Sequence, residues 1–468
     1  MSRRVLVAVL ALLPALPARA APEPAGEAPR EPARVVLLSI DGLRPSSYMH
    51  PDELGLAVPN LRRLVREGAF ASGVEGVLPT VTYPSHTTMI TGVPPAVHGI
   101  FGNTLVDPTG LSNDAWYWYA SSVRVPTLVS AVRARGGTVG AVLWPVTVGL
   151  DADWLVPEFW RTGSMHPSDL ELLRALSTPG LVEGVEQARG AALGIPVTDA
   201  DRTDLALAIL RDHCPELLLV HLAGVDHEEH LYGPEAPESR AAIEEADRNL
   251  GRLLAALDGS GLAASTLLVV VSDHGFGTAT KLVRPNALLA ENGLLEVDDK
   301  GKITSWKAWF LSHGGSASLH LADPDDTATL AKVRALLAAK LGEPQPAIRA
   351  ILERPEIAAL GGDPRAALFV DAADGWFLSR TPTGGWAGEP HDRGYHGYDP
   401  RRPMMHASLL VRSPGLSVHG DLGVVAMTRI APTVARFLGV AIDPAAAAAL
   451  DLFGPAAAGA LAAPAAGR

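Results

Sequence analysis

The chain has 468 residues, of which 47% are hydrophobic, 19% charged and 5% aromatic. This is enough apolar material for a large core, and the composition excludes a disordered, collagen-like or disulfide-stapled protein. The single cysteine, Cys214, excludes an intramolecular disulfide and a multi-cysteine zinc site, and the net charge of −12 argues against a general nucleic-acid backbone binder. A soluble globular enzyme or binding protein remains.

The first twenty residues have the layout of a secretory signal peptide. Two arginines precede an apolar run from Val5 to Leu16, and small residues surround a cleavage point near Ala20. The run is short for a membrane span, although an uncleaved anchor is the alternative. We therefore expect a periplasmic or secreted protein with no transmembrane segment in the mature chain. Residues 21–33 are expected to be a linker and residues 446–468 an Ala/Pro-rich tail.

Three apolar runs each lead into an aspartate. They are Arg34–Ile40 before Asp41, Leu217–Leu222 before Asp226, and Thr266–Ser272 before Asp273. A fourth run spans Thr138–Leu143. Continuous apolar runs of this length are typical of strands that are buried on both faces of a parallel sheet.

Helical patterns alternate with these runs. They span Pro59–Glu67, Thr127–Arg135 and Arg240–Leu257. The alternation predicts an α/β fold with a doubly wound, mainly parallel sheet. Ligands of such sheets bind at the carboxyl ends of the strands, which is where the three aspartates fall. An aspartate after a strand is often only a helix cap, but three together favour a site.

Two of the aspartates have a histidine nearby. Asp226 and His230 are four residues apart, so a helix would place both on one face. Asp273 and His274 are adjacent, and they can approach two ions only if the backbone turns, which Gly275 permits.

A third histidine, His396, lies between glycines near the C-terminal end. Together with Asp41 and the two pairs above, it completes a set of three aspartates and three histidines. Such mixed ligands suit zinc or a similar divalent cation, and six ligands exceed what one catalytic zinc takes, so we infer two ions. The remaining histidines in comparable contexts are expected to cap, pack or lie in loops: His86, His98, His313, His320, His391 and His406.

A threonine begins the helix-like segment around Pro84. Thr82 stands where the unpaired backbone N–H groups of a helix start favour an anion. A threonine hydroxyl is a poor nucleophile unless a base or a metal activates it. Two ions about 4 Å apart can activate the attacking oxygen and stabilise the leaving oxygen.

These motifs, in this order, resemble the nucleotide pyrophosphatase/phosphodiesterase family of the alkaline phosphatase superfamily, as a bacterial secreted member. The motifs are Asp41-Gly42, Thr82-Tyr83-Pro84-Ser85-His86, Asp226 with His230, Asp273-His274-Gly275 and His396-Gly397-Tyr398-Asp399. The resemblance covers roughly residues 34–440. It implies an alkaline-phosphatase-like core over residues 34–280 and 391–445, and we interpret residues 281–390 as an inserted α+β cap.

The resemblance also implies two zinc ions and a covalent mechanism. One ion would be held by Asp226, His230 and His396, and the other by Asp41, Asp273 and His274 with Thr82. Thr82 would attack phosphorus in line to form a phosphothreonine-type intermediate, which a metal-bound water would hydrolyse. The chain departs from the family at Ser85. The family usually has an asparagine there, whose amide donates to a phosphate oxygen, so the resemblance implies that Ser85 is a substrate-binding residue.

The substrate class is the open question. The segment Leu143–Gly149 lacks the basic residue that a phosphomonoester would need, and the resemblance implies that Tyr83 and Phe159 stack a nucleobase. We therefore expect cleavage of phosphodiester or nucleotide pyrophosphate bonds in small-molecule substrates, without binding to nucleic-acid duplexes. A secreted alkaline phosphomonoesterase that uses the same two-metal threonine site is the alternative. A sulfatase is excluded because Thr82 occupies the nucleophile position.

Overall fold

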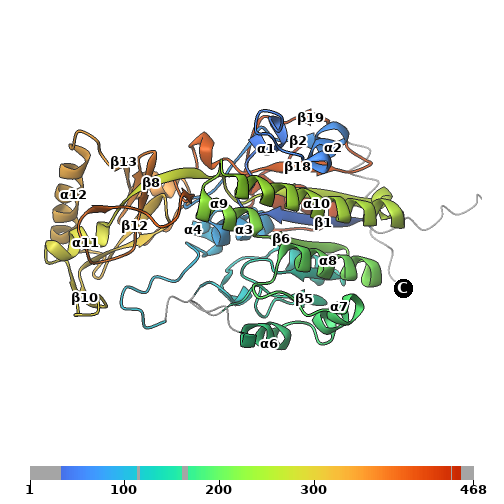
Figure 1. Cartoon of the computed structure of the whole chain (residues 1–468), viewed down its shortest axis with the longest axis horizontal. Coiled ribbons are helices and arrows are strands. Elements are labelled where there is room, and N and C mark those ends of the chain that lie inside the picture. Colours follow the sequence, from blue (N-terminus) through green and yellow to red (C-terminus); the bar gives the residue numbers. More distant parts are fainter. Residues whose placement is uncertain (1–32, 113–115, 161–166, 444, 455–468) are drawn as a thin grey trace, which may run out of the picture. The chain divides into compact units, whose positions relative to one another are not determined.

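A large mixed sheet forms the centre of the computed structural model, which describes residues 33–112, 116–160, 167–443 and 445–454 (Figure 1). The strand order is β19-β2-β18-β7-β1-β6-β4-β5. The central strands are β7 (Thr266–Val271), β1 (Arg34–Ile40), β6 (Leu217–Leu222), β4 (Val139–Val142) and β5 (Trp154–Val156), all parallel to their neighbours in this group. The edge strands are β18 (Leu409–Arg412), β2 (Ala69–Phe70) and β19 (Gly420–Asp421), of which β18 is antiparallel to both of its neighbours.

Helices cover both faces of this sheet, which confirms the doubly wound α/β fold. Successive residues of β1 point to opposite faces, so Val36 and Leu38 pack in one core cluster while Val35 and Leu37 pack in another. The first core includes α2 (Pro59–Glu67), α6 (Pro167–Leu176), α7 (Leu181–Arg189), α8 (Asp199–His213) and α10 (Pro237–Ser260). The second includes α3 (Thr82–Thr91), α5 (Leu128–Ala134) and α14 (Ile430–Leu438).

Most of the expected elements occur at the expected residues. β1, β6 and α2 have the predicted bounds, whereas α10 begins at Pro237 rather than Arg240 because proline is suited to the first turn of a helix. Short elements near the sheet are α1 (Ser46–Met49), β3 (Gly73–Glu75), α4 (Pro95–His98), α9 (Gly224–Tyr232) and β20 (Val424–Ala426).

A second set of strands lies between residues 277 and 395. β8 (Gly277–Val283) pairs with β15 (Gly375–Leu378), β16 (Ala387–Gly388) and β17 (Gly394–Tyr395). An antiparallel sheet has the order β11-β12-β14-β13, formed by Ala308–Ser312, Ser316–Leu321, Leu368–Ala372 and Ile348–Glu353. A small ribbon and three helices complete the region: β9 (Leu295–Val297), β10 (Ile303–Trp306), α11 (Pro285–Glu291), α12 (Thr327–Leu341) and α13 (Arg354–Ala359).

This region has a hydrophobic core of its own, which includes Phe310, Leu319 and Val370. The expected cap boundary at residue 281 falls inside β8, and the boundary at residue 390 falls between β16 and β17. The region is thus joined to the sheet through β8, whose first residues pair with the strand that precedes His396.

The N-terminal segments predicted from the sequence lie outside the described residues, whereas part of the predicted C-terminal tail is described. The predicted signal peptide (residues 1–20) and the linker up to residue 32 lie outside the described residues, as do residues 455–468. Within the predicted tail, Leu450, Leu452 and Phe453 are buried against the second core, and Leu450 N–H donates to Thr433 Oγ1. The packed fold therefore extends past residue 445, because these apolar side chains fill a gap beside α14. Among the described residues, no helix is both long enough and apolar enough to cross a membrane.

Candidate active site

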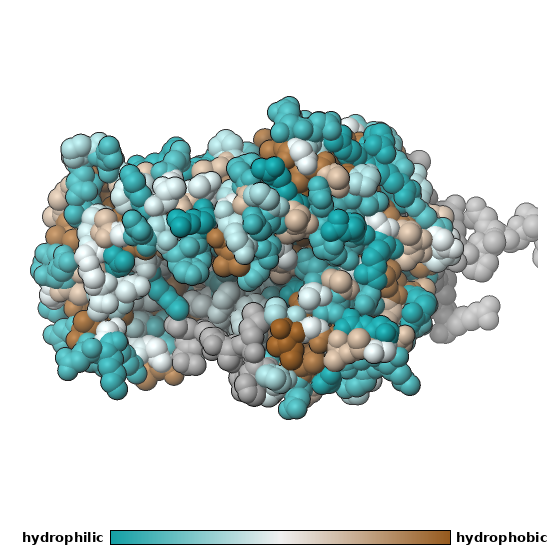
Figure 2. All heavy atoms as spheres, viewed as in Figure 1, coloured by the Kyte–Doolittle hydropathy of each residue, from teal (hydrophilic) through white to brown (hydrophobic). Residues whose placement is uncertain are grey.

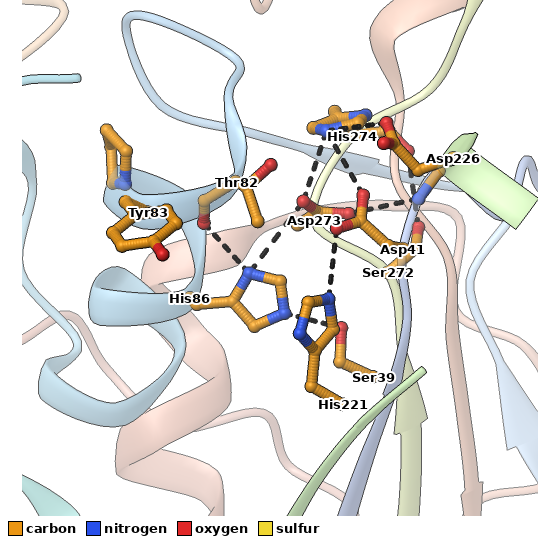
Figure 3. Close-up of polar contacts among 12 residues, drawn as sticks. Ser39, Asp41, Thr82, Tyr83, His86, His221, Asp226, Ser272, Asp273 and His274 are labelled. Carbon is orange, nitrogen blue, oxygen red and sulfur yellow. Dashed lines mark hydrogen bonds and ion pairs between the residues drawn. The ribbon is translucent and has the colours of Figure 1, made fainter. Parts of the chain in front are cut away.

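Two groups of possible metal ligands lie at the carboxyl ends of β1, β6 and β7. Asp226, His230 and His396 form one group, and Asp41, Asp273 and His274 form the other. Within each group the potential ligand atoms lie within 4.8 Å of one another. The six residues expected from the sequence are thus brought together, in the two expected sets, from four separate segments. Figure 3 shows four of them: Asp41, Asp226, Asp273 and His274.

The first group depends on helix α9, which follows β6. The four-residue spacing brings His230 Nε2 to 3.4 Å from Asp226 Oδ1, and His396 Nε2 lies 3.6 Å from the same oxygen. His230 Nδ1 donates to the Gly394 carbonyl at 2.9 Å, and His396 Nδ1 donates to the Thr80 carbonyl at 3.0 Å. Since each Nδ1 carries its proton in these bonds, each Nε2 is directed into the group, as in metal-binding imidazoles.

The second group depends on the turn after β7. His274 Nε2 lies 3.1 Å from Asp273 Oδ2 and 3.4 Å from Asp41 Oδ1. His274 Nδ1 donates to the Gly275 carbonyl at 3.2 Å, so this Nε2 also faces the carboxylates. Asp273 is held from its other side, because its Oδ1 accepts the Gly42 N–H at 3.1 Å.

The protonation behaviour of the site shows a surplus of negative charge. Burial raises the pKa of Asp41 well above its ordinary value, and the neighbouring Asp273 and Asp226 raise it further. Burial is the largest single influence on Asp226 and would raise its pKa, but the combined effects of His230, His396 and His274 outweigh burial and lower it. Conversely, Asp226 raises the pKa of His230 to about 9, against the opposing effect of burial. Positive charge placed here would relieve the repulsion.

The hydrogen-bonding state of the groups fits a metal. Four buried atoms have no hydrogen-bond partner: Asp41 Oδ1, Asp226 Oδ1, Asp273 Oδ2 and His274 Nε2. Buried polar atoms are nearly always bonded, so a cluster of exceptions needs an explanation. Carboxylate oxygens and an imidazole nitrogen are ligands for a divalent cation, and both groups therefore fit one.

Thr82 begins α3 beside these groups. It is 8% exposed, and it lines the larger of the two cavities near the site together with Asp41 and Asp226. The preceding Val81 has an extended backbone and makes no side-chain cap. The Tyr83 N–H donates to Asn103 Oδ1, the Ser85 N–H donates to the Val81 carbonyl, and Pro84 has no N–H, so the start of α3 can offer the Thr82 N–H to another acceptor. Figure 3 shows Thr82 close to Asp273 and Asp41.

Ser85 is not at the position expected for a phosphate contact. It lies inside α3, is fully buried, and lines neither cavity, and its hydroxyl has no hydrogen-bond partner. The side chain that reaches the start of α3 is that of Asn103, whose Oδ1 accepts the Tyr83 N–H at 3.0 Å. Asn103 lines the smaller cavity with His230 and His396. No local pattern in the sequence marks Asn103 as a site residue.

Tyr83 and Phe159 lie in a larger aromatic cluster than expected. Both line the larger cavity, but Tyr83 is fully buried and meets Trp116 and Trp118 edge to face, with ring centroids 5.2 and 6.0 Å away. Phe159 packs on Trp118 at 5.3 Å. An aromatic wall is therefore present beside Thr82, and the two tryptophans were not foreseen.

A buried polar network behind Asp41 was also missed. His221, near the carboxyl end of β6, is hydrogen-bonded at both ring nitrogens: Nε2 is 2.9 Å from Asp41 Oδ2, and Nδ1 donates to the Leu143 carbonyl at 3.1 Å. Arg202 Nη1 donates to the His221 carbonyl at 3.0 Å. Burial raises the pKa of the adjacent Glu158 to about 8, although Arg202 opposes the shift. The sequence signal for this network is the polar residue His221 within the otherwise apolar strand β6.

The other histidines do not join the two groups. His86 Nδ1 donates to the Thr82 carbonyl and Nε2 accepts from Ser39 Oγ, both at 2.8 Å, so both of its nitrogens are used within the fold. His98 and His313 are bonded to Thr88 and Ser318. His391 is exposed, whereas His320 and His406 lie outside both groups.

The fold and the site together define an α/β protein with paired candidate metal groups and a hydroxyl side chain beside them. The family model described as "Type I phosphodiesterase / nucleotide pyrophosphatase" matches residues 35–399. The chain belongs to this family, within the alkaline phosphatase superfamily.

Individual relatives agree with this assignment. Human ectonucleotide pyrophosphatase/phosphodiesterase family member 1 is 25% identical over 281 residues, which cover 58% of this chain and 26% of that protein. Bovine bis(5'-adenosyl)-triphosphatase ENPP4 is 26% identical over 258 residues, which cover 53% of this chain and 49% of that protein. The chain thus spans between a quarter and a half of these curated relatives.

Solved structures show the same fold. Human ectonucleotide pyrophosphatase/phosphodiesterase 5 matches with a TM-score of 0.63 and 19% identity, covering 88% of this chain and 96% of that one. The murine protein matches equally well, as an inactive threonine-to-alanine variant in complex with AMP. The mainly parallel, alkaline-phosphatase-like core is therefore confirmed.

Proposed function

We propose that this protein hydrolyses phosphodiester or nucleotide pyrophosphate bonds, with Thr82 as the nucleophile and two zinc or similar divalent ions as cofactors. The observation that carries the proposal is the meeting of two ligand groups, with four unpartnered buried ligand atoms, beside a threonine at the start of a helix. Membership of the family supports the reaction class.

The residues divide between the two ions as the geometry groups them. Asp226, His230 and His396 would hold one ion, and Asp41, Asp273 and His274 the other, with Thr82 adjacent. When bound, such ions supply Lewis-acid stabilisation of the attacking, leaving and non-bridging oxygens of the phosphoryl group. The backbone carbonyls of Gly394, Thr80 and Gly275 accept from the Nδ1 atom of each imidazole, so that Nε2 is the nitrogen directed to the ion.

The chain's own groups perform the bond changes. Thr82 Oγ1 would lose its proton and attack phosphorus, the bond to the leaving oxygen would break as that oxygen takes up a proton, and the phosphoryl group would remain esterified to Thr82. Water then attacks phosphorus and releases the Thr82 oxygen as a hydroxyl. The Thr82 N–H at the start of α3 favours the anionic phosphoryl group. Asn103 would add a donor, because its Oδ1 is engaged by Tyr83 N–H and its amide nitrogen remains for a phosphate oxygen.

The relatives add support for this assignment. The bovine relative is named for cleavage of a bis-adenosyl triphosphate, and the murine structure couples a threonine-to-alanine change with inactivity and bound AMP. We propose small-molecule nucleotide esters as substrates. The signal-peptide pattern supports export to the periplasm or the exterior, and the net charge of −12 disfavours duplex nucleic acid.

A phosphomonoesterase is the second candidate, and one observation favours it. Arg380, from the region between residues 281 and 390, lines the smaller cavity together with His230 and His396. A guanidinium at this position is suited to the additional negative charge of a monoester.

The test compares two substrates on the zinc-loaded protein. We expect kcat/KM for the p-nitrophenyl ester of thymidine 5′-monophosphate to exceed that for p-nitrophenyl phosphate at least tenfold, about 1.4 kcal/mol of differential transition-state stabilisation. Thr82→Ala should abolish both activities, and Arg380→Ala should leave the diester rate unchanged. A monoester preference that Arg380→Ala removes would support the second candidate. Full activity of Thr82→Ala would disprove the nucleophile.

A further inference from the structure

The larger cavity beside Thr82 extends well beyond the ligand groups. Its volume is about 760 Å³, and it runs from Asp41 and Thr82 toward residues of α6, α8 and α10. Apolar side chains such as Leu143, Leu170 and Leu173 form much of its wall. Figure 2 shows hydrophobic residues gathered on the same side of the molecule, near the position of α6 in Figure 1. A cavity of this size accepts an organic group, not only a phosphate.

Besides the Oδ1 atoms of Asp41 and Asp226, three polar atoms of the described residues lining this cavity are buried and have no hydrogen-bond partner. They are Tyr83 Oη, Glu158 Oε2 and Arg202 Nε. Their residues are 0%, 2% and 7% exposed, and all three line the cavity. None of them belongs to either ligand group, so the metal ions do not account for them.

A hydrogen bond holds the side chain of Arg202 and another holds the backbone of Glu158. Arg202 Nη1 donates to the His221 carbonyl at 3.0 Å, while the nearest carboxylate oxygen to its Nε, Asp199 Oδ1, is 3.9 Å away. Glu158 is fixed at its backbone, whose N–H donates to Thr147 Oγ1 at 3.3 Å. Its Oε2 lies 3.8 Å from His221 Nδ1, too far for a hydrogen bond. Arg202 Nε is therefore a donor without a partner, and Glu158 Oε2 is a carboxyl oxygen without a partner.

Buried polar atoms without partners are costly, and native proteins keep them where a ligand or ordered water completes them. Here a guanidinium and a carboxyl group lie in one cavity, whose wall combines aromatic and aliphatic side chains with further carboxyl groups such as those of Glu238 and Glu245. That combination suits a flat group with an apolar face and a hydrogen-bonding edge, which is the chemistry of a nucleobase.

We propose that Glu158 and Arg202 hydrogen-bond to the polar edge of a base-like group on the substrate, while the cavity wall packs against its ring. We call this pair of residues the recognition floor. The inference rests on the proposed function, because the group must be carried by the ester that Thr82 attacks. Under this proposal the two residues determine specificity and take no part in the bond changes.

The experiment compares three p-nitrophenyl diesters on the zinc-loaded full chain. Their second substituents are thymidine, 2-phenylethyl and methyl, which provide a ring with a polar edge, a ring without one, and no ring. We expect wild-type kcat/KM to be at least tenfold higher for the thymidine ester than for the phenylethyl ester. Glu158→Met should reduce that ratio to threefold or less. Glu183→Met, a change at an exposed glutamate of α7, should leave the ratio unaltered.

The outcomes separate the two proposals. A wild-type ratio below threefold would overturn the recognition floor, and it needs no variant to fold. A ratio that survives Glu158→Met in protein with an unchanged melting temperature would overturn it as well. If the wild type cleaves none of the three diesters, including the methyl ester, the proposed function itself fails.

Discussion

The imidazoles of His274 and His396 stack face to face, with ring centroids 3.6 Å apart and planes inclined by 7°. The two residues belong to different ligand groups. The stack therefore places the two groups side by side. Two ions that act together in an in-line displacement on one phosphorus must lie close to each other.

Removal of His396 should uncouple the pair of sites. We expect His396→Ala to bind about one zinc ion per chain instead of two and to lose at least ~100-fold in kcat/KM, or about 2.7 kcal/mol. Metal content after dialysis, measured by mass spectrometry, checks the stoichiometry. His391→Ala is the matched control, because His391 lies in the same stretch but is exposed. Two ions retained in His396→Ala would contradict the ligand assignment.

Asp41 should have opposite effects on stability with and without metal. Burial, Asp273 and Asp226 hold the pKa of Asp41 well above its ordinary value, so keeping Asp41 ionised destabilises the metal-free fold increasingly as the pH rises above its unfolded pKa. In chelator at pH 8 we expect Asp41→Asn to be more stable than wild type by at least about 1 kcal/mol. In zinc the order should reverse, because a ligand is lost.

Urea unfolding in EDTA and in zinc checks this crossover. The same order of stability in both buffers would show that repulsion between the carboxylates does not dominate the metal-free site.

We expect the fold to lose stability on acidification, because it contains buried histidines that stay neutral in the folded chain. Burial lowers the pKa of His98 to about 3 and that of His320 to about 4. Between the unfolded value near 6.5 and these values, the unfolded chain takes up protons that the folded chain does not. Each residue therefore removes about 1.4 kcal/mol of stability per pH unit as the pH falls below 6.5.

We expect the stability of His98→Gln in chelator to fall less than that of wild type between pH 6.5 and pH 5. The difference should approach ~2 kcal/mol. His419→Gln, at an exposed histidine, should follow the wild-type slope. Parallel slopes for wild type and His98→Gln would mean that His98 is protonated in the folded chain.

Gly397 should be intolerant of a side chain. Its φ is +88°, and a Cβ there would lie 1.8 Å from the His313 carbonyl oxygen. Gly397→Ala is expected to destabilise the fold by more than about 1 kcal/mol and to weaken zinc binding, since it shifts the neighbouring His396. Gly415→Ala, where a Cβ meets nothing within 4 Å, is the control. Unchanged melting temperature and metal content in Gly397→Ala would show that the backbone adapts freely.

The central strands and the residues of the two ligand groups could be predicted from the amino-acid sequence alone. Continuous apolar runs such as β1 and β6 are strong local signals, and the aspartates after them fall at one sheet edge in any parallel arrangement. The four-residue spacing of Asp226 and His230 is likewise local, because a helix places both on one face. His396 was recognisable only through its glycine-flanked motif.

Only the tertiary structure decided what surrounds these residues. It buried Ser85 inside α3, brought Asn103 to the start of that helix, and packed Phe453 into the core beyond the predicted domain end. It also placed Glu158 and Arg202 in one cavity. Some of these relationships, such as the meeting of Glu158 and Arg202 in one cavity, join residues that are distant in sequence. Others, such as the burial of Ser85, depend on which face of a helix is covered. Such contacts are set by the packing of whole elements, and no local pattern of residues encodes them.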